Sequence, residues 1–132
     1  INVLKAGKDY GWPFVAYGPL PPSDPPRNSN TVKEGTEQPI YYWGPVSLAP
    51  SSMMFYTGDM FPKWQGNLFL TGLSSQHMSR VLLDGNHVIG EERLLDEPGH
   101  RLRHVSQGAD GAIYVLEDMP MPKILKLTAP ED

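Results

Sequence analysis

Residues 99–118 read G-H-R-L-R-H-V-S-Q-G-A-D-G-A-I-Y-V-L-E-D. The alternating segment before the glycines and the apolar run after Gly111 predict two strands joined by a turn. Because side chains two residues apart on a strand project to the same face, we expect Arg101 and Arg103 to aim two positive charges at one place. The sequence leaves open whether that charge meets a ligand or only water.

An earlier segment of the chain repeats this pattern. G-N-L-F-L beginning at Gly66 recurs as G-A-I-Y-V beginning at Gly111, and each copy is followed by a turn and another apolar strand. A period of about 40 to 50 residues built from antiparallel strands is typical of the blades of a β-propeller. An isolated β-sandwich is the alternative.

The sequence therefore predicts an all-β fold of antiparallel four-stranded blades, with about two blades present. The turn Asp84-Gly85-Asn86 is a strong hairpin signal, because these residues tolerate positive φ. The second blade has only three expected strands, and the missing outer strand is one that many propellers take from the beginning of the chain. The expected strands are 53–56, 67–71, 79–83 and 88–95 in one blade (53–95), and 101–107, 112–117 and 123–128 in the last (96–132).

The first part of the chain, residues 1–52, carries weaker signals. We expect a strand flanked by turns within 1–18, and a long loop over 19–39, where P-L-P-P-S-D-P-P cannot bury enough apolar surface to fold alone. A polyproline II ligand for another domain is the alternative for that loop. Residues 40–57 are rich in aromatic side chains, which suit either a core or a wall that faces a ligand.

Composition excludes several classes of protein. The 132 residues suffice for one domain, and the net charge of −4 gives no reason to expect a nucleic-acid partner. Cysteine is absent, which removes disulfides, thiolate metal sites and a cysteine nucleophile. We find neither a signal peptide nor an apolar run long enough to span a membrane, and the chain begins as if cut from something longer.

Four ordered motifs carry a resemblance to a known family. They are G-K-D-Y-G-W-P, then A-P-S-S-M-M-F-Y-T-G-D-M-F-P-K-W-Q-G-N-L-F-L-T-G-L, E-E-R-L-L and R-L-R-H-V-S-Q-G-A-D-G-A-I-Y-V-L-E-D. Together they resemble the C-terminal part of the soluble quinoprotein aldose dehydrogenases, the glucose/sorbosone dehydrogenase family. The resemblance implies a six-bladed β-propeller, usually periplasmic, that binds pyrroloquinoline quinone (PQQ) with calcium and oxidises sugars or related alcohols.

The resemblance also assigns individual residues. Arg101 and Arg103 match the R-x-R-D-V motif, which presents two guanidinium forks to the carboxylates of the cofactor. Ser47 matches a hydroxyl residue that contacts the cofactor just before A-P-S. Tyr42 and Trp43 match an aromatic wall near the substrate, with one extra residue in the alignment before Ser47.

Three positions depart from the family pattern. Ser74 stands where L-x-x-L-K carries a cofactor-binding lysine, and losing that contact would cost about 1.5 to 3 kcal/mol. His104 replaces the aspartate of R-x-R-D-V, removing a charge that could hold the arginines in place. Glu117 puts a carboxylate where Y-V-L-T-D has a hydroxyl, and strand alternation does not decide whether it faces the cofactor.

The resemblance places the catalytic histidine and the calcium ligands in parts of the family sequence that this chain lacks. We therefore assign no catalytic and no metal-binding residue here, and expect the four histidines to be surface or turn residues. The predicted function is the C-terminal portion of a quinoprotein sugar dehydrogenase, inactive alone, with the missing blades or further copies of the chain as partners. The alternative is a non-catalytic binding or assembly module with a degenerate cofactor site.

Overall fold

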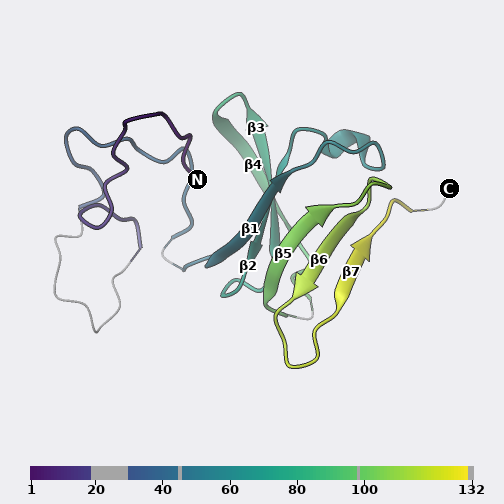
Figure 1. The fold of residues 1–132 in the computed structure, drawn as a ribbon. Helices are drawn as coiled ribbons and strands as arrows, with labels where there is room; N and C mark the ends of the chain where they lie inside the picture. The colour runs from purple at the N-terminus through teal and green to yellow at the C-terminus, as the bar shows by residue number, and fades with distance from the viewer. Residues whose placement is uncertain (19–29, 45, 98, 131–132) are drawn as a thin grey trace. The chain divides into compact units, whose positions relative to one another are not determined.

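The computed structural model describes residues 1–18, 30–44, 46–97 and 99–130, which fall into two units, 1–47 and 48–132 (Figure 1). Within the described residues no helix is long and apolar enough to cross a membrane. The strands found among the described residues all lie in the second unit. In chain order the elements are β1 (Pro50–Phe55), the 3-10 turn η1 (Pro62–Trp64), β2 (Leu68–Gly72), β3 (Met78–Asp84), β4 (His87–Leu94), β5 (Leu102–Gln107), β6 (Ile113–Glu117) and β7 (Ile124–Leu127).

The strands form two antiparallel sheets, ordered β1-β2-β3-β4 and β5-β6-β7. Each of the seven strands predicted between residues 53 and 128 is present within a few residues of its expected bounds, so the all-β prediction is confirmed. The predicted hairpin is also present, because Asp84 pairs with His87 across Gly85, whose φ is 56°. A four-stranded meander followed by three strands of a second one is the arrangement of about two propeller blades.

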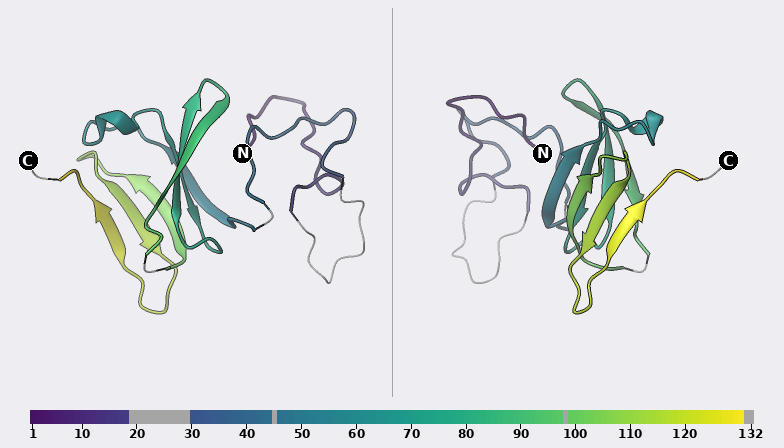
Figure 2. Two further views of the ribbon diagram at one scale, coloured as in Figure 1. Left: turned by 180° about the vertical axis from the view of Figure 1, so that it is seen from behind. Right: turned by 45° about the vertical axis from the view of Figure 1, so that its right-hand side comes forward.

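The hydrophobic core lies between the two sheets, which face each other (Figure 2). Tyr56 closes one end of this core, where its hydroxyl donates a 2.7 Å hydrogen bond to the carbonyl of Gly111. Phe61 and Trp64 stack with 4.3 Å between ring centroids and pack against the same cluster. The buried core residues are Tyr56, Phe69, Met78, Leu102, Val105, Ile113 and Val115.

The first unit corrects one expectation, because its described residues contain no strand. The strand predicted within 1–18 is replaced by turns and one isolated bridge, between Asp9 and Thr36. Gly7 and Gly11 have φ values of 71° and 89°, which interrupt the extended backbone that a strand needs. Of the predicted loop over 19–39, residues 19–29 lie outside the described residues, and the rest contain no strand.

Candidate arginine site

A β-bulge displaces Arg103 from the regular ladder of the second sheet. Leu102 pairs with Glu117 and His104 pairs with Leu116, so Arg103 is an extra residue without a partner across the strand. Such a bulge re-aims the side chains beside it. As a result Arg103 and His104 are both exposed, while Leu102 before them is buried in the core.

Both arginines converge on one carboxylate, that of Asp118. Arg101 donates from Nε and Nη2 to Asp118 Oδ2 at 3.0 and 2.8 Å, and Arg103 Nη2 donates to the same oxygen at 2.9 Å. The amide of Asp118 also donates to the carbonyl of Arg101 at 2.8 Å, which places the two residues opposite each other. The two side chains share one place, as predicted, and are about half exposed, at 47% and 49%.

The local charge of this cluster is positive, since two guanidinium groups face a single carboxylate. The pKa of Asp118 lies below its ordinary value, first because Arg101 donates hydrogen bonds to it, with burial opposing the shift and the charge of Arg103 adding to it. Asp118 therefore stays ionised near neutral pH and partly neutralises the pair. Sequence reasoning missed this residue, although it closes the quoted stretch Y-V-L-E-D.

We expect acid to weaken the fold through Asp118. Because its folded-state pKa is depressed, its ionised form stabilises the fold fully above the unfolded value of about 3.9, and this contribution is lost as the pH falls through the folded value. The urea concentration at the unfolding midpoint should fall between about pH 6 and pH 3 in the wild type, and it should fall less in Asp118→Asn. Asp84→Asn, in the exposed hairpin, is the control; identical curves for Asp118→Asn and wild type would contradict this role.

His104, one departure from the family pattern, does not leave the arginines without an anion. Its Nδ1 lies 3.0 Å from Ser52 Oγ on β1, while the carboxylate of Asp118 pairs with both arginines. Ser51 Oγ donates a 2.7 Å hydrogen bond to the carbonyl of Leu102 on β5. The starts of β1 and β5 are thus tied together at one end of the two sheets (Figure 1).

Glu117, the second departure, points away from the arginines. It pairs with Leu102, whose side chain is in the core, and its own side chain is only 4% exposed. His100 Nδ1 donates to its carboxylate at 2.7 Å, and the amide of Lys123 donates at 3.0 Å. The hydrogen bond from His100, opposed by burial and helped by that amide, lowers the pKa of Glu117. This carboxylate is engaged inside the sheet and does not face the arginine side.

Ser74, the third departure, is exposed in the turn between β2 and β3. The turn is fixed to the residues before β1, because the amides of Leu73 and Ser75 donate to the carbonyls of Ala49 and Leu48 at 3.0 and 3.4 Å. β2 ends and β5 begins at the same end of the two sheets, so this turn and the arginines share that end (Figure 1).

The other predicted site residues lie in the first unit. Tyr42 is 53% exposed and stacks on Tyr17 with 4.1 Å between centroids, and Trp43 packs edge-on against Tyr41 at 5.0 Å. Ser47 is exposed at the end of that unit. The structure brings Arg101 and Arg103 together within the second unit. Tyr42, Trp43 and Ser47 belong to the first unit.

The histidines are only partly as expected. His87 is exposed in the hairpin and His104 is exposed on β5. His77 is only 6% exposed, but it lies in the turn between β2 and β3, so these three fit the expectation of surface or turn residues. His100 is bound to Glu117. Across the part of the chain that the structure describes, no group of three or more His, Asp or Glu side chains could hold a metal ion.

The fold defines the class of protein: β-propeller blades, which here carry a pair of arginines at one end of their sheets. The family described as Glucose / Sorbosone dehydrogenase matches residues 1–126. The chain belongs to this family.

The relatives support that assignment. The chain is 37% identical over 129 residues to the aldose sugar dehydrogenase YliI of Escherichia coli (strain K12), which covers 97% of this chain. It is similar to a crystal structure of a glucose dehydrogenase, with a TM-score of 0.90 and 42% identity over 98% of this chain. The fold is also shared with the PQQ-bound aldose sugar dehydrogenase of Streptomyces coelicolor, with a TM-score of 0.69 and 21% identity over 96% of this chain. The chain spans about a third of these proteins, 34%, 37% and 35% of their lengths.

Proposed function

We propose that this chain forms the arginine side of a PQQ site in a sugar-oxidising β-propeller and is inactive without the remaining blades. The observation that carries the proposal is the convergence of Arg101 and Arg103 on one oxygen of Asp118. Two guanidinium groups that hold one carboxylate are already oriented for a second, because an arginine fork matches the geometry of a carboxylate.

The hydrogen-bonding capacity of the pair fits a ligand with several carboxylates. Two guanidinium groups carry about ten N–H donors, and Asp118 takes three of them. The cluster keeps a net positive charge with Asp118 ionised, and both arginines are half exposed. A carboxylated quinone would therefore meet free donors and a favourable charge on this side.

The roles that we propose for the individual residues follow the family resemblance. When bound, the quinone would accept hydride from an aldose or a related alcohol. Arg101 and Arg103 would bind and orient it, with Ser47 as a further contact and Tyr42 and Trp43 as a wall for the sugar. The histidine base and the calcium ion would belong to the other blades, and the location would be the periplasm, as in the family.

The partners that we propose for this chain are the neighbouring blades. Met53 and Phe55, 64% and 58% exposed, alternate with the core-facing residues of β1 and so lie on the outer face of the first sheet. Leu116 and Ile124 pair on the outer face of the second sheet and are also exposed. Neighbouring blades on both faces would cover this apolar surface, and the length of the relatives supports such blades. The alternative, closure of a ring by copies of this chain, predicts an oligomer by light scattering.

A chimera tests the proposed function. Residues 1–126 replace the matching third of the Escherichia coli relative, and dye-linked oxidation of an aldose is measured with added PQQ and calcium. We expect oxidation by the chimera and none by this chain alone. Oxidation by the isolated chain would contradict its dependence on other blades, and a folded chimera without PQQ binding would contradict the arginine site.

A non-catalytic module is the second candidate, and Ser74 favours it. An exposed serine stands in the turn where the family pattern carries a lysine, so one charged contact to the cofactor is missing. Restoring it with Ser74→Lys should tighten PQQ binding to the chimera about tenfold or more, the scale of one charge-assisted hydrogen bond. A chimera that binds no PQQ even with this change would favour the non-catalytic module.

A further inference from the structure

The strands β1 and β5, which belong to different sheets, each contain a β-bulge. In β1 the extra residue is Ser51, and in β5 it is Arg103. Ser51 Oγ donates a 2.7 Å hydrogen bond to the carbonyl of Leu102, the residue directly before Arg103. The bulge of the first sheet therefore contacts the backbone beside the bulge that presents this arginine.

The carbonyl of Leu102 points out of its own sheet. The amide of Asp118 donates to the carbonyl of Arg101 at 2.8 Å. In an antiparallel ladder this makes the next pair, Leu102 with Glu117, one that exchanges no main-chain hydrogen bond. The main-chain groups of Leu102 thus point away from β6, and β5 stands at the edge of the sheet. Because Leu102 is only 1% exposed, the hydroxyl of Ser51 supplies a hydrogen bond that bulk water cannot.

The hydroxyl of Ser51 is itself fixed by the first sheet. Its Oγ lies 2.9 Å from Thr71 Oγ1 and 3.2 Å from the carbonyl of Thr71, a fully buried residue of β2. Because the carbonyl of Leu102 is the nearest acceptor, Ser51 gives its proton there and can accept the proton of Thr71 Oγ1. The hydrogen bonds thus run in one direction, from β2 through β1 to β5.

These hydrogen bonds end between the two arginines. Leu102 separates Arg101 from Arg103, and both arginine side chains reach the same oxygen of Asp118. Arg101 is fixed within its own sheet, because its carbonyl accepts from the amide of Asp118. Arg103 is the extra residue of a bulge, where the ladder is disrupted. The contact at Leu102 therefore bears directly on where the side chain of Arg103 points.

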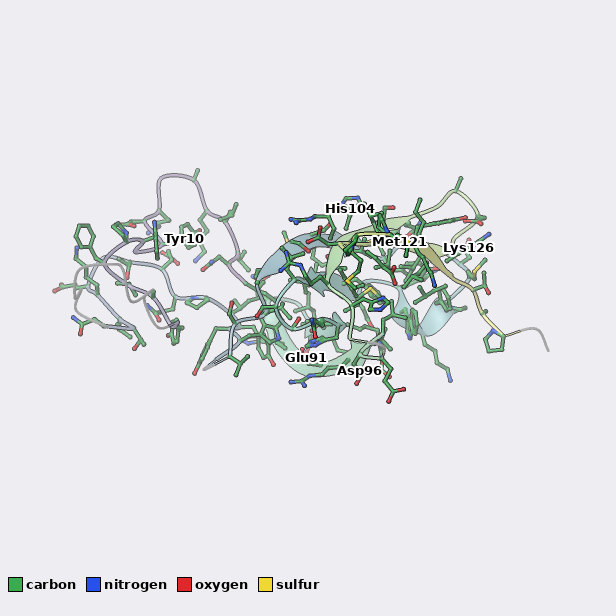
Figure 3. The ribbon with its side chains drawn as sticks, turned by 90° about the horizontal axis from the view of Figure 1, so that it is seen from below. Tyr10, Glu91, Asp96, His104, Met121 and Lys126 are labelled. Atoms are coloured by element: carbon green, nitrogen blue, oxygen red, sulfur yellow. The ribbon has the colours of Figure 1, made fainter. Side chains whose placement is uncertain are left out.

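The next serine makes a contact of a different kind. Ser52 Oγ lies 3.0 Å from Nδ1 of His104, the residue after Arg103. This contact joins two side chains and is exposed to solvent, and Figure 3 shows His104 on the outside of the molecule. A side chain can rotate away from such a contact without moving the backbone. Ser52 therefore restrains the bulge less than Ser51, whose partner is a main-chain carbonyl.

We propose that Ser51 is a positioning residue for the arginine pair: through the carbonyl of Leu102 it fixes the bulge that directs Arg103. The inference deepens the proposed cofactor site, and it rests on the proposed function only for its effect on PQQ, because the contacts themselves involve no cofactor. Thr71 lies next to the last residue of β2, so the same hydrogen bonds also set the arginines relative to the β2–β3 turn.

The test measures how fast the guanidinium group of Arg103 rotates, by NMR of the whole chain with ¹⁵N-labelled arginine near neutral pH. In the wild type this rotation is slowed, because Arg103 Nη2 donates to Asp118 at 2.9 Å. In Ser51→Ala the bulge is no longer fixed, and we expect the rotation to be about tenfold faster, the scale of one hydrogen bond to a charged group. Equal rates in Ser51→Ala and the wild type would overturn the proposal.

Three further variants separate the hydroxyl from general packing. Ser51→Thr keeps the hydroxyl and should restore the slow rotation of Arg103, whereas Ser51→Val has the shape of threonine without the hydroxyl and should not. Ser52→Ala removes the neighbouring hydroxyl and should leave the rotation slow. The backbone amide signals of β3 show whether each variant is folded. If Ser51→Ala does not fold, the comparison of threonine with valine decides, and equal rates in these two variants would refute the role of Ser51.

Binding of PQQ to the chimera gives the second readout. We expect Ser51→Ala to weaken PQQ binding about tenfold, and Ser52→Ala to leave it unchanged. Faster rotation of Arg103 in Ser51→Ala, together with a chimera that binds no PQQ, would support the role of Ser51 and reject the quinone site. Unchanged rotation, together with a chimera that binds PQQ, would do the reverse.

Discussion

Phe69→Ala is expected to lower the free energy of unfolding by about 3 to 5 kcal/mol. Phe69 is fully buried on β2, and its ring packs at 6.2 Å from Tyr56 and at 5.5 Å from Trp64, measured between centroids. The aromatic cluster ties η1 to the core between the sheets, so an alanine leaves a cavity that the rigid sheet cannot fill. The measurement is urea unfolding followed by tryptophan fluorescence and by circular dichroism.

The control for this prediction is Met53→Ala. Met53 lies on β1, next to β2, but is 64% exposed on the outer face, so its truncation should change the free energy of unfolding by about 0.5 kcal/mol or less. If Phe69→Ala does not fold, Phe69→Leu supplies a smaller cavity and an intermediate loss. Equal effects of the Phe69 and Met53 variants would contradict a core located between the two sheets.

The strands could be predicted from the sequence because each signal is local. The alternation of apolar and polar residues predicts the strands, and the glycines together with Asp84-Gly85-Asn86 predict the turns. The repeat that begins at Gly66 and again at Gly111 predicts the division into blades. The same local logic failed within 1–18, where apolar and aromatic residues suggested a strand but the backbone turns at Gly7 and Gly11.

The site was predictable only in part, because it depends on register. The sequence places Arg101 and Arg103 two apart, but a bulge, which leaves no mark in the sequence, decides where Arg103 and His104 point. Asp118 becomes their partner only once β6 is aligned with β5. Ser51 likewise reaches the carbonyl of Leu102 only once the two sheets face each other, a contact that the sequence does not specify.

Replacing both arginines should have the largest effect on the proposed ligand. We expect Arg101→Gln and Arg103→Gln each to weaken PQQ binding to the chimera about ten- to a hundredfold, and the double variant more than either, because each loses a charge-assisted hydrogen bond of about 1.5 to 3 kcal/mol. Each single variant leaves Asp118 paired with the remaining arginine, whereas the double variant leaves its carboxylate uncompensated before an anionic ligand. The measurement is PQQ titration of the chimera, checked by dye-linked aldose oxidation at saturating and at limiting PQQ.

Two matched variants distinguish a ligand contact from a general loss of charge. Lys126→Gln removes a cation of similar exposure on β7 of the same sheet, whose partner is Asp110 in the β5–β6 turn at 2.8 Å, and should leave PQQ binding unchanged. Arg103→Lys keeps the charge but not the fork, and should fall between wild type and Arg103→Gln, since an ammonium group does not offer the paired N–H donors that match a carboxylate. If Lys126→Gln weakened PQQ binding as much as Arg103→Gln does, the arginine pair would act only through net charge, and the geometry at Asp118 would have no part in binding the quinone.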